Sequence, residues 1–369
     1  MKKSLSILLL VAFLIIGYAI SSILGTDKTD ENTERGRVLD IVESSEEGGV
    51  FGRGFQLLRV QLLTGELKGE EVFIDNQLSD NPAFSIKAKQ GDLVVLYVDR
   101  RGDLTFHLSD FVRDRYVFYL FAGFILLLLL VGRGSGLKSF VTLSITAFIV
   151  IRFMVPQILD GRSPIAISTV SAAIITVTTF FIVSGINAKS VSAVIGTLIG
   201  VIAAGSLAYL TGFTANLTGM SSEEAIMLMH IPQRVDFDFR GLLFSGIIIG
   251  ALGAVMDVAM SISSAMHEMK SLKPDIEQKR LIRSGMTIGR DVMGTMTNTL
   301  ILAYAGSSLS LLILFMAYQT SIVRILNTDL IATEVIRALS GSIGIIVTIP
   351  ATALIAGTLL KTGKSFRER

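Results

Sequence analysis

Cysteine is missing from this chain of 369 residues, and charged residues are scarce at 17%. The absence of cysteine excludes disulfide bonds, thiolate metal sites and thiol nucleophiles. Roughly a quarter of the residues of a soluble domain are charged, so the low share argues against a soluble protein. A net charge of +2 offers no basic surplus for nucleic-acid phosphates, which argues against nucleic-acid binding. The sequence also lacks a P-loop from which ATP hydrolysis could be argued.

Long apolar runs are abundant instead. From position 116 onward, runs of about 20 residues recur, which is the length that crosses a hydrocarbon core of roughly 30 Å. The predicted spans are Tyr116–Val131, Phe140–Val155, Ile165–Ser184, Val191–Thr211, Gly241–Ser264, Met296–Tyr318 and Leu339–Leu360. With an N-terminal segment they make about eight spans, so we expect an α-helical polytopic membrane protein.

The N-terminal segment, residues 1–25, begins with Lys2 and Lys3 and is apolar from Leu5 to Ile16. Signal peptides and uncleaved anchors share this pattern. The apolar run continues to Leu24 and approaches spanning length, so we predict a membrane anchor. Cleavage by a signal peptidase is the alternative, and it would remove one span.

Residues 26–114 hold most of the acidic residues and have short runs with strand character. These runs are Arg37–Val42, Phe55–Leu63, Glu71–Ile74, Leu93–Val98 and Leu104–Leu108, with turns at 64–66, 90–92 and 101–103. Five short strands in fewer than 90 residues predict a small all-β domain, an SH3-like or OB-like barrel. The remaining residues, 115–369, are predicted to form a seven-helix transmembrane domain.

The basic residues predict the orientation, because loops on the cytoplasmic side retain lysine and arginine. Fourteen lie on one predicted side: Lys2, Lys3, Arg133, Lys138, Lys189, Lys270, Lys273, Lys279, Arg280, Arg283, Lys361, Lys364, Arg367 and Arg369. Six lie on the other: Arg152, Arg162, Arg234, Arg240, Arg324 and Arg337. We therefore expect both termini in the cytoplasm and an extracytoplasmic β domain.

One predicted span carries a carboxylate in an apolar setting. Asp257, Ser261, Ser264 and Glu268 follow one another at helical spacing, so they fall on one helix face. An ionisable group in a span costs roughly 2.5 to 3.5 kcal/mol on insertion scales and needs a partner, water or a function. Asp257 is thus the first candidate for an ion-binding or proton-carrying residue, and a buried structural ion pair is the alternative.

A second polar face precedes the next predicted span and consists of Arg290, Asp291, Thr295 and Asn298. In an antiparallel hairpin the two faces can meet, and Arg290 could pair with a carboxylate. The remaining oxygens could hold a hard cation or pass protons. A location at the membrane interface, where charges are inexpensive, is the alternative for Glu268, Arg290 and Asp291.

Small residues mark the places where helices can approach closely. Gly196 and Gly200 form one GxxxG pair, and Gly246 and Gly250 form another that Gly253 continues. Such pairs pack helices together in membranes. We predict packing within one chain, with a homo-oligomer seam as the alternative.

Several segments have a specific sequence, namely GALGAVMDVAMSI at 250–262, SG at 284–285, IGRDVMGTMTNTL at 288–300 and AYAG at 303–306. The β domain adds TGE at 64–66 and GD at 91–92. With these segments the chain resembles the YibE/F family of bacterial membrane proteins. The resemblance implies a multi-pass protein of the bacterial inner or plasma membrane, and it implies that Asp257, Arg290, Asp291 and Asn298 belong to family motifs. The resemblance implies no particular ligand or activity.

Three functions fit the sequence. The first is a permease or channel for a small solute or ion that uses intramembrane carboxylates for cation or proton coupling. The second is a non-catalytic component of an envelope or export complex, with the β domain contacting an envelope protein partner. The third, which we rank last, is an intramembrane hydrolase with Asp257 and Asp291 as a dyad. The sequence identifies no cofactor.

Overall fold

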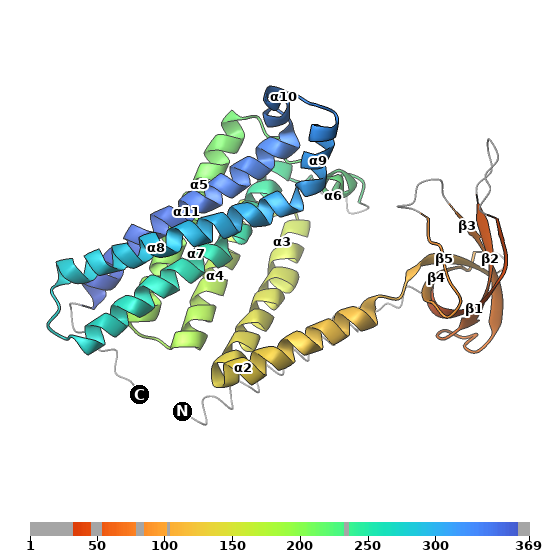
Figure 1. Cartoon of the computed structure of the whole chain (residues 1–369), viewed down its shortest axis with the longest axis horizontal. Helices are drawn as coiled ribbons and strands as arrows, with labels where there is room; N and C mark the ends of the chain where they lie inside the picture. Colours follow the sequence, from red (N-terminus) through yellow and green to blue (C-terminus); the bar gives the residue numbers. More distant parts are fainter. Residues whose placement is uncertain (1–31, 46–53, 79–84, 102–103, 232–235, 361–369) are drawn as a thin grey trace. The chain divides into compact units, whose positions relative to one another are not determined.

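The computed structural model describes residues 32–45, 54–78, 85–101, 104–231 and 236–360. The chain divides into two compact units, residues 1–136 and 137–369, and Figure 1 labels the elements of both. The predicted N-terminal anchor and the basic C-terminal tail lie outside the described residues.

The first unit contains an antiparallel sheet with the strand order β3-β2-β1-β4-β5. The strands are β1 (Thr33–Ser45), β2 (Phe55–Leu62), β3 (Glu71–Gln77), β4 (Leu93–Asp99) and β5 (Thr105–Phe111). Each of the five predicted strands overlaps one of them. In β2 every second side chain is buried, from Gln56 to Leu62, which is the period of a strand with one buried face. The prediction of an all-β domain is confirmed.

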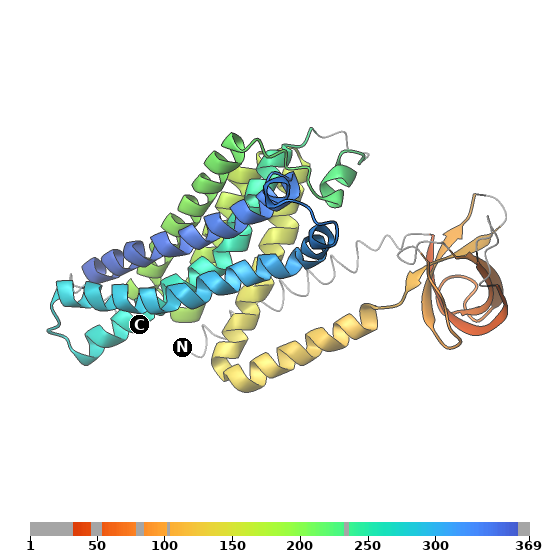
Figure 2. The ribbon, with the colours of Figure 1, turned by 45° about the horizontal axis from the view of Figure 1, so that its top comes forward.

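The sheet curls so that its two edge strands, β3 and β5, come into contact. Figure 2 shows the strands arranged as a ring. The long strand β1 pairs with β2 along most of its length and with β4 through Thr33–Arg37. Of the two predicted barrel classes, this strand order favours the OB-like one.

Two buried amides fasten the segment between β3 and β4 to the barrel. The Gln56 side chain donates to the carbonyl of Ala88 (3.2 Å) and accepts from its N–H (3.0 Å). The Asn76 amide donates to Gln56 Oε1 (3.1 Å) and to the carbonyl of Ile86 (2.7 Å). These bonds satisfy polar groups that would otherwise be buried without partners.

The helices begin with α2 (Asp114–Phe148), η2 (Ile149–Met154) and α3 (Val155–Leu159), which run on without a loop. Two predicted spans lie in this stretch, and Arg133 separates them because its backbone is not helical (φ 47°, ψ −125°). Side chains before this break are largely exposed, such as Leu120 at 77% and Val131 at 83%. Apolar side chains exposed in this number indicate contact with lipid.

The second unit continues with nine helices in the described residues. Their bounds are α3 as above, α4 (Pro164–Ser184), α5 (Ala188–Thr214), α6 (Glu223–Leu228), α7 (Phe239–Leu272), α8 (Gln278–Ser307), α9 (Leu309–Ala317), α10 (Ile322–Leu326) and α11 (Asp329–Leu359). In the described part of the chain, five helices are long and apolar enough to cross a membrane, or six if α8 and α9 form one span. The predicted fold class, an all-β domain followed by a polytopic helical domain, is confirmed.

The predicted span Met296–Tyr318 is wrong in its limits. The helix α8 begins at Gln278, and α8 and α9 are bent by 62° at their junction. Gly306, Ser307 and Ser308 lie at the bend, and glycine and serine pairs are common sites of kinks. The early start follows from residues 278–295 being amphipathic: Leu281, Gly285 and Gly289 are buried while the opposite face is polar.

Helix α7 occupies the centre of the bundle and packs against α4, α5, α8 and α11 (Figure 1). Its side chains Val255, Val258 and Ile262 belong to the largest hydrophobic core cluster.

The two GxxxG pairs differ in their surroundings. A methyl group at Gly200 would overlap the Thr348 hydroxyl of α11, whereas one at Gly246 would meet nothing within 4 Å. The first pair is therefore a close helix contact within the chain.

Candidate functional site

Helix α7 places its candidate residues on a face that the other described helices leave uncovered. An N-terminal cap starts this helix, because the Asp238 carboxylate accepts a hydrogen bond from the Gly241 N–H (2.8 Å). Further along, Asp257, Ser261 and Glu268 are exposed and Ser264 is half-buried. Their i, i+4, i+7 and i+11 spacing continues the line of Gly246, Gly250 and Gly253, which are also exposed.

Helix α8 carries the second set, Arg290, Asp291, Thr295 and Asn298, and all four are exposed. They lie opposite the face through which α8 packs on α7 and α11. The Thr295 hydroxyl donates to the carbonyl of Val292 (2.9 Å), so its oxygen remains available as an acceptor. We call these four residues, together with Asp257, Ser261, Ser264 and Glu268, the polar track.

An apolar seam separates the two halves of the polar track. Helices α7 and α8 form an antiparallel hairpin, in which Gly289 lies against Ile262 and Gly285 against Met266. The absence of side chains at these glycines lets the helices approach on apolar contacts. Since each residue turns the helix by about 100°, Arg290 and Asp291 point away from this seam.

The predicted pairing of Arg290 with a carboxylate is not what the structure shows. Among the described residues, Arg290 forms no ion pair with Asp257, Glu268 or Asp291. No hydrogen bond joins the carboxyl groups of Asp257 and Asp291 in this part of the chain either. The apolar packing of the hairpin is the physical reason, because it turns the two polar faces outward instead of toward each other.

A further polar cluster, which the sequence patterns do not predict, lies between α8 and α11. The Arg337 guanidinium forms an ion pair with Glu334 one helical turn away (2.8 Å) and lies 5.8 Å from the ring centre of Tyr304. The Tyr304 hydroxyl in turn approaches Gly250 of α7. The predicted last span starts at Leu339, which leaves Arg337 in a connection, whereas α11 starts at Asp329. The i, i+3 spacing of Glu334 and Arg337 was the available signal.

The described residues include no group of three histidine, cysteine, aspartate or glutamate side chains that could hold a metal ion. A hard cation at Asp257 would therefore need hydroxyl, amide or backbone oxygens, or water, as its other ligands. Ser261 and Ser264 are the hydroxyls on the same face of α7.

Two protein-family models together match nearly the whole chain. A family model described as YibE/F-like protein matches residues 120–362. A second, described as the YibE/F family N-terminal domain, matches residues 32–111. No curated protein matches the chain. No solved structure matches it either.

Proposed function

The chain belongs to the YibE/F family, and on this premise we propose that it is a permease or channel for a small solute or ion, with Asp257 as the coupling carboxylate. The observation that carries the proposal is the polar track on the exposed faces of α7 and α8. Charged and polar side chains that face outward from apolar helices need water, an ion or protein against them.

The position of Asp257 within its predicted span supports this argument. In the span Gly241–Ser264 it lies 16 residues after the start and 7 before the end. At about 1.5 Å per residue the nearer end is roughly 10 Å away, so Asp257 lies in the half of the span next to the turn between α7 and α8. A charge at the centre of a span costs roughly 2.5 to 3.5 kcal/mol on insertion scales. An aqueous pathway or a bound cation beside Asp257 would offset this cost.

Polar groups continue along the hairpin on both sides of Asp257. Toward the start of α7 lie Tyr304, Arg337 and Glu334, near Gly250. Toward its end lie Ser261, Ser264 and Glu268 on the same face of α7. A pathway for an ion or a proton requires polar groups in succession, which this face of α7 supplies, whereas the α8 residues of the polar track lie across the apolar seam.

For the orientation, we propose that both termini face the cytoplasm of a bacterial cell and that the β domain lies outside the membrane bilayer on the other side. The excess of basic residues supports this, fourteen against six by sequence position. Five of the fourteen lie at the turn between α7 and α8: Lys270, Lys273, Lys279, Arg280 and Arg283. This turn would then be the cytoplasmic end of the polar track.

A second candidate is a non-catalytic component of an envelope complex. The β domain exposes two aromatic side chains, Phe73 at 64% and Tyr97 at 39%, which could contact a protein partner. A hydrolase ranks below both. A pair of carboxyl groups that share a proton must lie within hydrogen-bonding distance, and Asp257 and Asp291 form no such bond among the described residues.

Ion and proton flux in liposomes that contain the purified full chain tests the proposal. Asp257→Asn should abolish flux, because the amide keeps the shape and loses the charge and the proton. The matched control is Asp275→Asn, the same change at an exposed position in the turn between α7 and α8, which should leave flux unchanged. Normal flux in Asp257→Asn would overturn the role of this carboxylate. No flux in the wild-type protein would overturn the permease and favour the envelope complex.

A further inference from the structure

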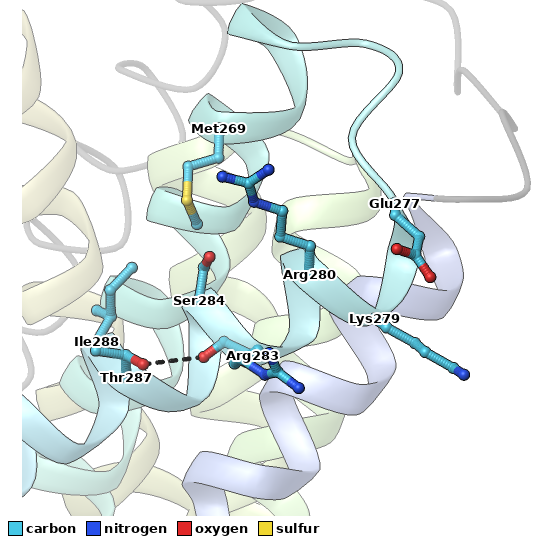
Figure 3. Close-up of a pocket in the computed structure, with 8 residues that line it drawn as sticks. All are labelled: Met269, Glu277, Lys279, Arg280, Arg283, Ser284, Thr287 and Ile288. Carbon is cyan, nitrogen blue, oxygen red and sulfur yellow. Dashed lines mark hydrogen bonds between the residues drawn. The ribbon is translucent and has the colours of Figure 1, made fainter.

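We propose that a pocket at the connected ends of α7 and α8 binds a phosphate group. The pocket has a volume of about 620 Å³ and is open to the surface. Its lining residues are Met269, Glu277, Lys279, Arg280, Arg283, Ser284, Thr287 and Ile288, and we call it the basic pocket (Figure 3). It contains no residue of the polar track, so the inference does not depend on transport.

The cationic side chains of the basic pocket come from the first two turns of α8. Lys279, Arg280 and Arg283 line the pocket with three positive charges against the single carboxylate of Glu277, and in Figure 3 the Arg280 guanidinium extends toward Met269 whereas the Lys279 ammonium group points away. Among the described residues none of these three cations forms an ion pair. The pocket therefore has an uncompensated positive charge, and the planar fork of arginine matches phosphate oxygens in a bidentate manner.

Two hydroxyl groups follow on the same side of the helix, one turn apart. The Thr287 hydroxyl donates to the carbonyl of Arg283 (3.1 Å), so it is occupied as a donor. The Ser284 hydroxyl has no hydrogen bond to another described side chain or backbone group. In Figure 3 it points to the side where the Arg280 guanidinium lies. One free hydroxyl donor beside a guanidinium suits an anion that accepts several hydrogen bonds.

The apolar part of the lining distinguishes the basic pocket from an ordinary basic loop. Arg280 extends toward Met269 of α7 in Figure 3, and Ile288 continues the apolar surface along α8. Basic residues that only set the orientation of the chain in the membrane do not need an apolar surface beside them. Lys270 and Lys273 carry charge at the same turn and do not line the pocket. A phosphate group, either free or in the headgroup of an anionic phospholipid, is the chemistry that the lining recognises.

The test measures binding to the purified full chain by native mass spectrometry, with inorganic phosphate, phosphatidylglycerol and phosphatidylcholine as separate probes. We expect Arg280→Gln/Arg283→Gln to weaken binding of phosphate or phosphatidylglycerol at least about tenfold, because each lost charge-assisted hydrogen bond is strong. The control Lys270→Gln/Lys273→Gln removes the same charge from the same turn outside the pocket and should bind as the wild type does.

The outcomes separate the two sources of phosphate. Binding of inorganic phosphate would identify a soluble ligand, and binding of phosphatidylglycerol alone, without phosphatidylcholine, would identify a lipid headgroup. Equal losses in both double variants would overturn the proposal, since charge in general and not the pocket would be responsible. Absence of binding by both phosphate probes would overturn it as well. Equal elution volumes and melting temperatures of the variants exclude misfolding. The result of the flux experiment on Asp257→Asn does not depend on whether the basic pocket binds phosphate.

Discussion

Two polar side chains of the β domain and two of the helical bundle have opposite surroundings. In the barrel, buried Gln56 and Asn76 are joined to each other and to the backbone by four hydrogen bonds. In the bundle, Asp257 and Arg290 lie on outward faces and form no ion pair among the described residues. A partnered polar group stabilises the fold, whereas a polar group that the fold leaves without a partner at membrane depth is available for function.

The largest effect should come from breaking a partnered group. In Gln56→Ala, the N–H and carbonyl of Ala88 lose their partner inside the barrel. Each unsatisfied buried group costs about 1 to 3 kcal/mol, so the β domain should lose at least about 2 kcal/mol. Amide hydrogen exchange of β1 and β2 in the full chain measures this loss. The control Gln61→Ala lies on the same strand and forms no side-chain bond of this kind; an equal loss there would contradict the explanation.

The next effect separates the two GxxxG pairs. Gly200→Ala should destabilise the bundle by about 1 to 3 kcal/mol, because the new methyl group overlaps Thr348. Gly246→Ala meets nothing within 4 Å and should be neutral or slightly stabilising, since alanine favours a helix over glycine. Chemical denaturation of the purified protein in detergent measures both. Similar losses in the two variants would show that Gly246 has a packing partner outside the described residues.

A smaller effect is expected at Glu34, the one buried carboxylate of the described β domain. Burial raises the pKa of Glu34, the attraction of Arg100 lowers it by less, and Glu66 adds to the rise. The folded domain therefore binds the proton more tightly than the unfolded chain does. The stability of the domain should fall as pH rises from the unfolded pKa through the raised folded pKa.

Glu34→Gln copies the protonated form and should remove this pH dependence. The variant should resist unfolding better than the wild type at neutral pH and equally well in acid. Amide hydrogen exchange of β1, measured at several pH values, tests the prediction. A wild-type domain whose protection rises with pH across this window would have the opposite sign and would contradict it.

The smallest effect should come from the polar track. Asn298→Ala removes an exposed amide that has no partner among the described residues, so stability should stay within about 0.5 kcal/mol of the wild type. Denaturation in detergent provides the measurement. A loss above about 1 kcal/mol would place Asn298 in a structural contact, and the contrast between the two regions would then no longer hold.

Much of the fold could be predicted from local sequence patterns. The run Phe55–Leu63 is predicted as a strand from its strand-like composition between turn signals, and β2 covers Phe55–Leu62. The limits of α8 could not be predicted from hydropathy, because its first half is polar along one side and packs through Leu281, Gly285 and Gly289 on the other. A helix that is polar on one side has a low average hydropathy, so hydropathy does not detect it. The 3.6-residue period of its apolar residues does reveal such a helix.

The sequence by itself determined the class of the protein and most of its apolar spans, which follow from composition and from the length of apolar runs. It also determined the five strands and the helix faces on which Asp257 and Arg290 lie, which follow from local residue patterns. Only the tertiary structure decided where those faces point. Close contact of Gly285 and Gly289 with Met266 and Ile262 makes the seam of the hairpin apolar. The same kind of long-range contact brings Arg337 to Tyr304. Such contacts depend on side-chain volumes in segments far apart in the chain, and no local period contains that information.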